Sequence, residues 1–411
     1  MIRRILFLTP QLPYPPHQGT AIRNFGLIRG LAERGYSVSL LSFIEPDQPP
    51  ASETPLVDLC ASVTTIPAPE RTRSQRIRDL LSGHADMARR RWSEAFLAAL
   101  HERLDVESFD AIHIEGIEMA PYLPALRMAA PHALLIYDAH NAEYALQRRI
   151  AAQDVRIPKR WPAAIYSLIQ SSRLTRFETL VCRQVGHVLA CSEADARMLR
   201  ALPHHTPVSV VPNGISVKSY AEDDLASVQT PHPALVFTGK MDFRPNVDAV
   251  LWFTGDILPR IQKEIPTAHF VVVGQKPHAR LNVLHGRKDV ALTGFVPDVR
   301  PYMAAADVYV APLRMGSGTR LKLLEAMAMR RAIVSTRLGA EGLPVDDGVH
   351  LLLADTPAEF AEAVLWLLRE PQRRQELGEH AAHLVQQHYD WSVIVPRLEE
   401  VYQVRKADAA C

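Results

Sequence analysis

The chain has 411 residues, of which 47% are hydrophobic and 22% charged, and its formal net charge is +1. This length exceeds one ordinary core and predicts two domains, and the composition is that of a globular chain rather than a disordered one. The balanced charge argues against a dedicated nucleic-acid binder, so no nucleic-acid partner is expected.

Four cysteines occur, none in a Cys-x-x-Cys pair or a zinc-binding spacing, which indicates free thiols in a reducing compartment. The apolar run near the N-terminus is too short for a signal peptide. No window reaches the roughly 20 apolar residues of a membrane-spanning helix. We therefore expect a cytoplasmic protein that is soluble or peripheral to a membrane.

In the first half, short apolar runs alternate with segments of helical period. The first strand is expected at 3–10, followed by an amphipathic helix over 19–35 that ends at Gly35. Alternation of this kind predicts a parallel sheet covered by helices on both faces. Further strands of this sheet are expected at 36–43, 109–116, 133–140 and 186–192.

The pattern restarts after a segment rich in Pro, Ser and Asp. A second series of strands is expected at 234–240, 268–274, 290–294, 307–312, 332–336 and 349–355. Thr356, Pro357 and Glu359 then have the spacing of a capping box at a helix start. We predict a first domain over 1–202, a linker over 203–232 and a second domain over 233–388.

Ligands of doubly wound sheets bind beyond the carboxyl ends of the strands, so the strand-to-helix turns are the places to inspect. The first turn has one glycine, Gly19, where a dinucleotide fingerprint needs three, which argues against a dehydrogenase. Gly19 precedes a helix and could let the backbone approach a phosphate or sugar. The alternative is that a long loop needs one flexible residue.

Polar side chains crowd the turn after the strand at 133–140, where Asp138, His140, Asn141 and Glu143 follow one another closely. Such a density of hydrogen-bonding groups is costly to bury and favours a ligand contact or a catalytic base. The alternative is a helix start that Asp138 or Asn141 caps. His113 is a second candidate, for which a core histidine is the alternative.

Two turns of the second domain carry cations. Lys240, Arg244 and Asn246 follow the strand at 234–240 and suit a diphosphate beside a helix N-terminus, or else form a solvated surface loop. The stretch 316–325, with the sequence GSGTRLKLLE, is the stronger signal.

Two glycines in that stretch, Gly316 and Gly318, precede a helix expected to start near Thr319, so backbone N–H groups could face an anion. Arg320 and Lys322 would oppose the helix dipole there, which an anionic ligand would compensate. Glu325 shares a face with Lys322 and could accept hydrogen bonds from a ribose, or form an ordinary surface pair with the lysine.

These residues resemble a known family. The stretches VVPNGI, FTGKMDFRPNVDAVLWF, FVVVGQKP and GTRLKLLEAMAMRRAIVST are similar to the donor-binding half of the GT-B fold retaining glycosyltransferases of family 4, the group 1 glycosyltransferases. The first strand and helix and the stretch LIYDAHNAEY also resemble that family, so the likeness covers nearly the whole chain. Within it, the chain resembles the sugar transferases associated with PEP-CTERM and exopolysaccharide clusters.

The resemblance implies a fold and roles. It implies a GT-B fold, with two doubly wound Rossmann-like domains facing across a cleft, and a terminal segment, 389–411, that crosses back to the N-terminal domain. Glu325 matches the second glutamate of the family's Glu-seven residues-Glu motif, which holds the ribose. Lys240 matches the basic residue that faces the diphosphate, His140 the histidine that reaches the donor sugar, and Gly19 the glycine loop over the phosphates.

The chain departs from the family pattern at two positions. Ser317 stands where the first glutamate of the motif is expected, and Pro245 stands at the second basic position of the donor turn, beside Arg244 and Asn246. The resemblance then suggests that Arg320, and with it Lys322, supplies the missing positive charge.

The implied reaction moves a sugar from a nucleoside diphosphate to a hydroxyl of a glycan or lipid-linked glycan acceptor, with retention, in exopolysaccharide or other cell-surface glycan synthesis. Lys240, Arg320 and the helix start would stabilise the leaving diphosphate without a metal or cofactor. Three rivals stay open: a nucleotide-sugar epimerase of the same fold, a glycan phosphorylase and a non-catalytic glycan-binding protein.

Arginines cluster in 70–92 and 147–177, with Trp92, Trp161 and Tyr166 among them. Basic amphipathic helices suit an anionic membrane surface such as the inner face of the cytoplasmic membrane. The alternative is a solvated helical face packed by its apolar side.

Overall fold

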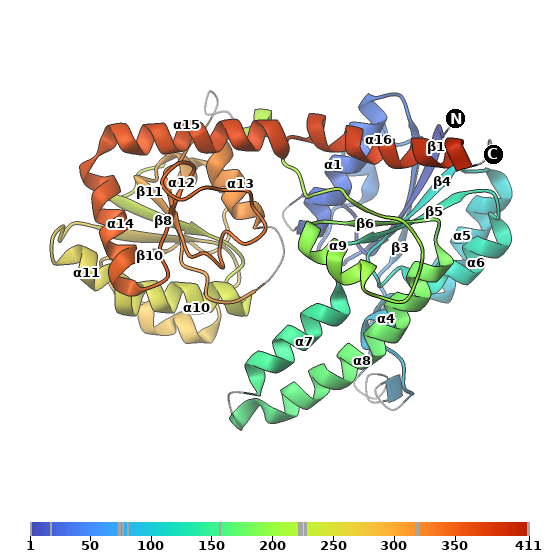
Figure 1. The fold of residues 1–411 in the computed structure, drawn as a ribbon, viewed down its shortest axis with the longest axis horizontal. Coiled ribbons are helices and arrows are strands. Elements are labelled where there is room, and N and C mark those ends of the chain that lie inside the picture. Colours follow the sequence, from blue (N-terminus) through green and yellow to red (C-terminus); the bar gives the residue numbers. More distant parts are fainter. Residues whose placement is uncertain are drawn as a thin grey trace. The chain divides into compact units, whose positions relative to one another are not determined.

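A computed structural model of the chain describes residues 2–16, 19–72, 75, 78–79, 82–155, 158–220, 225, 228–316 and 320–408, with the backbone alone for 404–408. The chain divides into two compact units (Figure 1). Unit 1 comprises Met1–Gly214 and Ile394–Cys411, and unit 2 comprises Ile215–Val393. The division falls inside the range 203–232, for which the sequence predicts a linker.

Unit 1 contains a parallel sheet in the order β3-β2-β1-β4-β5-β6-β7. Its strands are β1 (Arg4–Thr9), β2 (Ser37–Ile44), β3 (Ser62–Pro67), β4 (Ala111–Glu115), β5 (Leu134–Ala139), β6 (His187–Ala190) and β7 (Val208–Val210). The predicted strands are confirmed, and β3 and β7 extend the sheet at its two edges.

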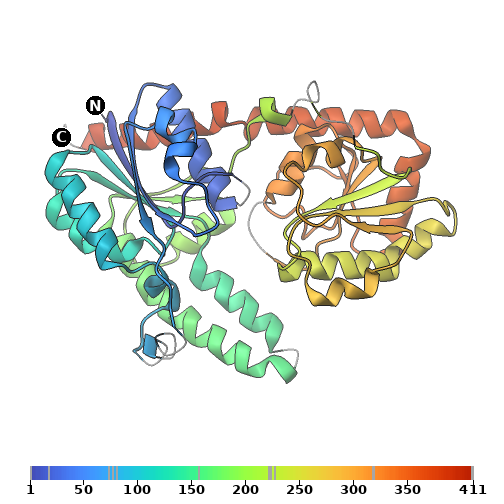
Figure 2. The same ribbon diagram turned by 180° about the vertical axis from the view of Figure 1, so that it is seen from behind.

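Helices of unit 1 alternate with these strands in the chain. They are α1 (Gly19–Glu33), α2 (Leu56–Leu59), α4 (Asp86–Arg90), α5 (Glu94–Val106), α6 (Leu123–Ala129), α7 (Glu143–Asp154), α8 (Trp161–Gln184), α9 (Glu193–Arg200) and the part of α16 (Trp391–Asp408) from Ile394 onward. Gly35 ends α1 with φ of +84°, a conformation that glycine adopts without strain. Figure 2 shows from behind that α7 and α8 form an antiparallel hairpin extending away from the sheet of this unit.

Unit 2 contains a second parallel sheet, in the order β10-β9-β8-β11-β12-β13. Its strands are β8 (Ala234–Thr238), β9 (His269–Val273), β10 (Val290–Leu292), β11 (Val308–Ala311), β12 (Ile333–Ser335) and β13 (Leu352–Leu353). Its helices are α10 (Arg244–Trp252), α11 (Leu258–Gln262), α12 (Arg300–Ala304), α13 (Leu321–Ala328), α14 (Pro357–Arg369) and α15 (Pro371–His388), with a π-helical turn at Phe253–Ile257.

Both faces of the second sheet are buried, because alternate residues of β8 enter different cores. Leu235 and Phe237 pack in one core, and Ala234 and Val236 in the other. The predicted capping box is confirmed at the start of α14, where Thr356 accepts from the backbone N–H of Glu359 and the Glu359 carboxylate accepts from that of Thr356. Two doubly wound α/β domains are therefore present, as predicted.

Candidate active site

In each sheet the strand order reverses at one place, between β1 and β4 in unit 1 and between β8 and β11 in unit 2. Turns on the two sides of such a reversal diverge and leave room for a ligand at the carboxyl ends of the strands. The candidate residues of each unit gather at this place and form one group in unit 1 and another in unit 2.

A fully buried ion pair anchors the group in unit 1. Nε and Nη2 of Arg23, on α1, donate to the two carboxylate oxygens of Asp138, at the end of β5, each over 2.9 Å. Nη1 of Arg23 donates to the carbonyl oxygen of Val211 over 2.8 Å. Removing one partner of a buried pair costs about 3–5 kcal/mol because the other charge stays buried. Arg23 therefore ties α1 to β5 and to the segment after β7.

Glu115, at the end of β4, lies between two histidines. Its Oε2 is 3.2 Å from Nε2 of His140, and its Oε1 is 3.3 Å from Nδ1 of His113. Nε2 of His113 lies 2.7 Å from the hydroxyl of Tyr402 on α16. A buried series of polar contacts thus runs from Tyr402 through His113 and Glu115 to His140, and it gives the core histidine His113 a connection to the predicted site.

The charges of this group set its pKa values. Burial opposes ionisation of Glu115, but hydrogen bonds from His113 and His140 outweigh it and hold its pKa well below the usual range. Burial likewise opposes the cationic form of His140, but the hydrogen bond to Glu115 and the negative charges of Asp138 and Glu115 raise the pKa of His140 above its ordinary value. His140 is thus biased towards the charged, donating form.

The start of α7 shows that neither Asp138 nor Asn141 caps this helix. The N-cap position is Ala142, whose backbone N–H donates to Asp195 over 3.1 Å. The next two N–H groups, of Glu143 and Tyr144, donate to Glu178 over 3.1 and 2.8 Å. The capping alternative is therefore wrong.

Glu115, Asp138 and His140 could in principle hold a metal ion, since one ligand atom of each lies within 4.8 Å of the others. Both oxygens of Asp138, however, accept from Arg23. A cation would have to displace a buried guanidinium, so these residues do not fit a resident metal. Their chemistry is that of a buried network of ion pairs and histidine contacts, in which His140 is the partly exposed member.

In unit 2, Lys322 on α13 is held against the end of β8. Its Nζ donates to the carbonyl oxygen of Thr238 over 2.6 Å and to Oδ1 of Asn246 over 2.8 Å, and it lies 4.1 Å from the centre of the Phe237 ring. Burial, followed by the nearby charge of Arg320, lowers the pKa of Lys322 to about 7. An anionic ligand close to Lys322 would stabilise the charged form of this lysine and raise its pKa again.

Gly239 makes room for this lysine. Its φ is +154°, and a Cβ there would lie 2.7 Å from Nζ of Lys322 and 2.6 Å from Nδ2 of Asn246. The turn after β8 therefore needs glycine for its backbone and for its packing.

Gly239→Ala is expected to lower the free energy of unfolding by about 1–3 kcal/mol, through backbone strain and displacement of Lys322. Thermal or urea unfolding measures this. Gly255→Ala is the matched control, because Gly255 lies in a helical turn and a Cβ there meets nothing within 4 Å. Equal stability of the two variants would contradict the role given to Gly239.

Arg320 precedes α13 at its N-cap position and is half-buried. Burial lowers its pKa, and Glu341 opposes the change. Gly316, with φ of +114°, passes so close that a Cβ there would lie 2.8 Å from Nη2 of Arg320. Two cations, Arg320 and Lys322, thus lie at one helix start, where the dipole disfavours them and an anion would compensate.

Glu325 lies one turn further along α13. Its Oε1 accepts from the hydroxyl of Tyr220, in the 3₁₀ turn η4 (Val217–Tyr220), over 2.9 Å. Burial raises the pKa of Glu325, although Tyr220 and Lys322 oppose this. The carboxylate retains a second oxygen, Oε2, that can accept from a pair of vicinal hydroxyls.

The remaining predicted residues take more varied places. Asn246 is buried, and its Nδ2 donates to the carbonyl oxygen of Lys240 over 2.9 Å. This hydrogen bond stabilises the turn between β8 and α10. Nζ of Lys240 lies 3.7 Å from Asp242 on a partly exposed surface. Arg244 is the first residue of α10, and Gly19 the first of α1. Ser317, Gly318 and Thr319 lie outside the described residues.

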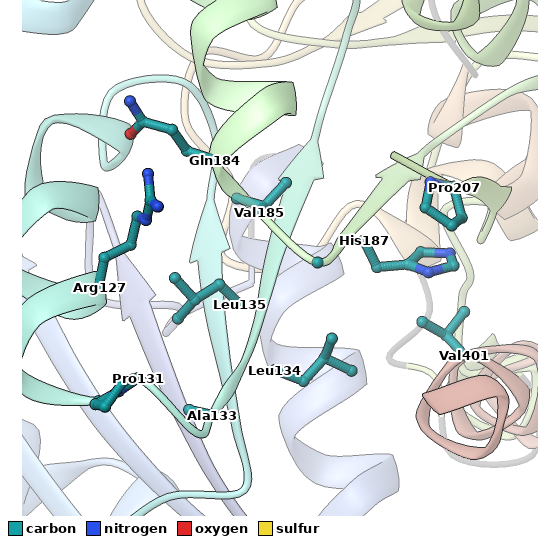
Figure 3. Close-up of a pocket in the computed structure, with 12 residues that line it drawn as sticks. Arg127, Pro131, Ala133, Leu134, Leu135, Gln184, Val185, His187, Pro207 and Val401 are labelled. Atoms are coloured by element: carbon teal, nitrogen blue, oxygen red, sulfur yellow. The ribbon is translucent and has the colours of Figure 1, made fainter. Parts of the chain in front are cut away.

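A pocket of about 440 Å³ lies elsewhere in unit 1, and Figure 3 shows residues that line it. Leu134 and His187, at the starts of β5 and β6, line it, so it lies at the amino ends of these strands, opposite the site described above. Burial lowers the pKa of His187 to about 4. This pocket has no cluster of charges suited to a diphosphate among its lining residues.

Two family models match the chain. Residues 18–219 match "Glycosyltransferase Family 4" and residues 232–370 match "Glycosyl transferases group 1". Phosphatidyl-myo-inositol mannosyltransferase of Mycobacterium tuberculosis is 30% identical over 204 residues, which cover 47% of this chain and 53% of that protein. An uncharacterized 44.6 kDa protein in the cps region of Klebsiella pneumoniae is 23% identical over 199 residues, 46% of this chain and 48% of that protein. The chain thus spans about half the length of the curated relatives it matches.

Solved structures share the fold over essentially the whole chain. Sucrose-phosphate synthase from Thermosynechococcus elongatus has a TM-score of 0.70 and 17% identity, with 100% of both chains covered. HepE from Anabaena in complex with UDP has a TM-score of 0.64 and 16% identity, with 98% of this chain and 100% of that chain covered. The fold and the two family models agree with each other. The chain belongs to the group 1, family 4 glycosyltransferases and has the GT-B fold.

Proposed function

We propose that the chain transfers a glycosyl group from a nucleoside-diphosphate sugar to an acceptor hydroxyl. The observation that carries this proposal is the arrangement at α13, where two cations precede a carboxylate held by Tyr220. Arg320 and Lys322 suit a diphosphate, and Glu325 suits the vicinal hydroxyls of a ribose. The structure of HepE, which is a complex with UDP, supports a donor of this chemical class.

In the proposed reaction the bond between the sugar and the diphosphate breaks, and negative charge grows on the leaving oxygen. Arg320, Lys322 and Lys240 stabilise that charge, so protein cations do this work and no metal or cofactor is needed. We propose transfer with retention, by same-face attack that the leaving phosphate assists. His140, held by Glu115, orients the donor sugar.

The acceptor is proposed to be a glycan or lipid-linked glycan of a cell-surface polysaccharide such as an exopolysaccharide, used at the inner face of the cytoplasmic membrane. Two relatives that match about half of this chain support this class of acceptor. One is named phosphatidyl-myo-inositol mannosyltransferase, and the other is named as a protein in a cps region. The described residues include no helix long and apolar enough to cross a membrane.

A panel of UDP, GDP and ADP tests the proposal by thermal shift, because a ligand that binds only the folded protein raises its Tm. The nucleotide that stabilises the protein then selects the sugar donors for hydrolysis and transfer assays. No stabilisation by any of the three would contradict the proposal and favour a glycan-binding protein. Conversion of the donor alone into its epimer would favour an epimerase.

Affinity for the selected nucleoside diphosphate is expected to fall about tenfold for each pH unit above 7. Lys322 has a pKa of about 7 in the free protein, so above that pH binding must restore its proton. Titration calorimetry in two buffers of different ionisation enthalpy measures this proton uptake. Lys322→Arg keeps the charge and should remove the uptake between pH 7 and 9. Uptake that persists in this variant would contradict the assignment to Lys322.

A further inference from the structure

The first half of α8, in the α7–α8 hairpin, has its polar and apolar faces reversed. Its buried face is small or polar and its exposed face is apolar, whereas a helix packed on a core buries its apolar face. In the first half of α8 the buried side chains are small or polar, and they include Ala164, Ser167, Gln170 and Ser171. Oγ of Ser171 donates to the carbonyl oxygen of Tyr144 on α7 over 2.9 Å, and Oε1 of Gln170 accepts from the backbone N–H of Asp86 over 2.9 Å. Polar contacts therefore hold this part of α8 to α7 and to the start of α4.

The outward face of the same helix is apolar. Trp161, Ile165, Leu168 and Ile169 are 56%, 58%, 50% and 42% exposed. Their spacing of three and four residues places them on one stripe of the helix. Isolated exposed apolar residues are normal, but a contiguous stripe of large ones indicates a surface that binds something.

Trp161 begins this stripe near the turn of the hairpin. Its indole Nε1 donates to the carbonyl oxygen of Val155 over 3.1 Å, and Val155 is itself 52% exposed. Trp161 is the first residue of α8, and the start of α8 lies at the end of the hairpin furthest from the sheet of unit 1 (Figure 1). Tryptophan is suited to a water–lipid boundary because its ring is apolar and its N–H is polar.

The charges of the hairpin have one sign at its surface. The acidic residues of 143–184, which are Glu143, Asp154 and Glu178, are all buried. Exposed charged residues in the same range are Arg148, Arg149, Lys159, Arg176 and Arg183. A second copy of the chain would bring like charges together, whereas an anionic surface is complementary to both the charges and the apolar stripe.

From this arrangement we propose that the α7–α8 hairpin docks unit 1 on an anionic lipid surface, with the stripe from Trp161 to Ile169 in the headgroup region and the arginines over it. The proposal extends the proposed function in one respect, since a lipid-linked acceptor would be presented at that surface. Docking itself needs no substrate and can be measured without one. Residues 73, 74, 76, 77, 80, 81, 156 and 157 of the basic stretches lie outside the described residues.

Co-sedimentation of the full chain with vesicles tests the proposal. We expect binding to phosphatidylcholine vesicles that contain phosphatidylglycerol, weak binding to phosphatidylcholine alone, and weaker binding at high salt. The triple variant Trp161→Ser, Ile165→Ser, Ile169→Ser and the double variant Arg148→Glu, Arg149→Glu should each lower the partition coefficient about tenfold or more.

Matched controls alter the same chemistry elsewhere. Val106→Ser with Met128→Ser removes exposed apolar residues of unit 1, and Lys263→Glu with Lys288→Glu changes the net charge by as much as the arginine variant. Both controls should bind vesicles as the unaltered chain does. Unchanged binding of the hairpin variants, or no binding of the unaltered chain to anionic vesicles at low salt, would overturn the proposal.

Two further readouts separate this proposal from its rivals. Hairpin variants should keep the nucleotide-induced rise in Tm, so loss of docking and failure of the proposed function are distinguishable. Analytical ultracentrifugation of the unaltered chain and the triple variant tests self-association. A dimer that the triple variant disrupts, together with no binding to vesicles, would assign the stripe to a second copy and overturn lipid docking.

Discussion

Glu325→Ala is expected to raise the donor KM by about 10- to 100-fold, since hydrogen bonds to a charged group contribute roughly 1.5–3 kcal/mol. The reason is the position of the carboxylate, one helical turn beyond Arg320 and Lys322, with one oxygen occupied by Tyr220 and the other able to accept from the ribose. In the proposed reaction the ribose keeps the same contacts while the sugar–phosphate bond breaks, so kcat should change much less than KM. Steady-state kinetics with a varied donor measures both parameters.

Arg320→Ala provides the contrast. In the proposed reaction Arg320 stabilises the leaving diphosphate, whose charge grows in the transition state. Its loss should therefore lower kcat/KM by roughly tenfold or more, about 1.4 kcal/mol, partly through kcat. Tyr220→Phe keeps the charge of Glu325 and should have a smaller effect on KM than Glu325→Ala. Unchanged donor kinetics in both Glu325→Ala and Arg320→Ala would contradict the donor site proposed for unit 2.

The architecture was predictable because parallel sheets buried on both faces leave a simple pattern of apolar runs. Edge strand β3 escaped prediction, since its residues Ser62–Pro67 are only partly buried and their sequence shows no clear apolar run. The predicted strand at 349–355 forms a ladder only at Leu352–Leu353, where it pairs with β12. Sequence pattern reports burial, and edges of sheets are where burial is weakest.

The candidate group in unit 2 was predictable where its residues lie close together in the chain. Lys322, Arg320 and Glu325 lie within one short stretch, and their conflict with the helix dipole is visible in the sequence. Two of their partners are not visible in this way: Tyr220 lies 105 residues before Glu325, and Thr238 lies 84 residues before Lys322. Such contacts depend on the tertiary fold and leave no local signal.

Arg23 and Glu115 were missed for a different reason. Arg23 lies on an amphipathic helix, where an arginine is ordinarily solvated, yet it is one of the largest fully buried side chains. Glu115 ends an apolar strand next to His113, and a charged residue in that place was a usable signal because buried charges need partners. The charged carboxyl end of β4 and the polar turn after β5 together are therefore a sequence signal of the group in unit 1.

Glu115→Gln is expected to lower kcat by about 10- to 100-fold with little change in donor KM, through its effect on His140. The carboxylate lies 3.2 Å from Nε2 of His140 and, with Asp138, raises the pKa of that histidine. Glutamine keeps the size and an acceptor but removes the charge, so the fold is retained and the pKa of His140 should fall. In the proposed reaction Glu115 positions His140, so its effect should be visible on the histidine itself.

NMR titration of labelled histidines, with His140→Gln to assign the signal, should show the midpoint of His140 at lower pH in Glu115→Gln. The free energy of unfolding provides a second measure with a definite sign. The raised pKa of His140 stabilises the fold below its unfolded value of 6.5, and the depressed pKa of Glu115 stabilises it above its unfolded value of 4.5. The variant should therefore lose most stability between these two values and less as the pH rises further. An unshifted His140 midpoint combined with a lowered kcat would show that Glu115 acts by some route other than this histidine.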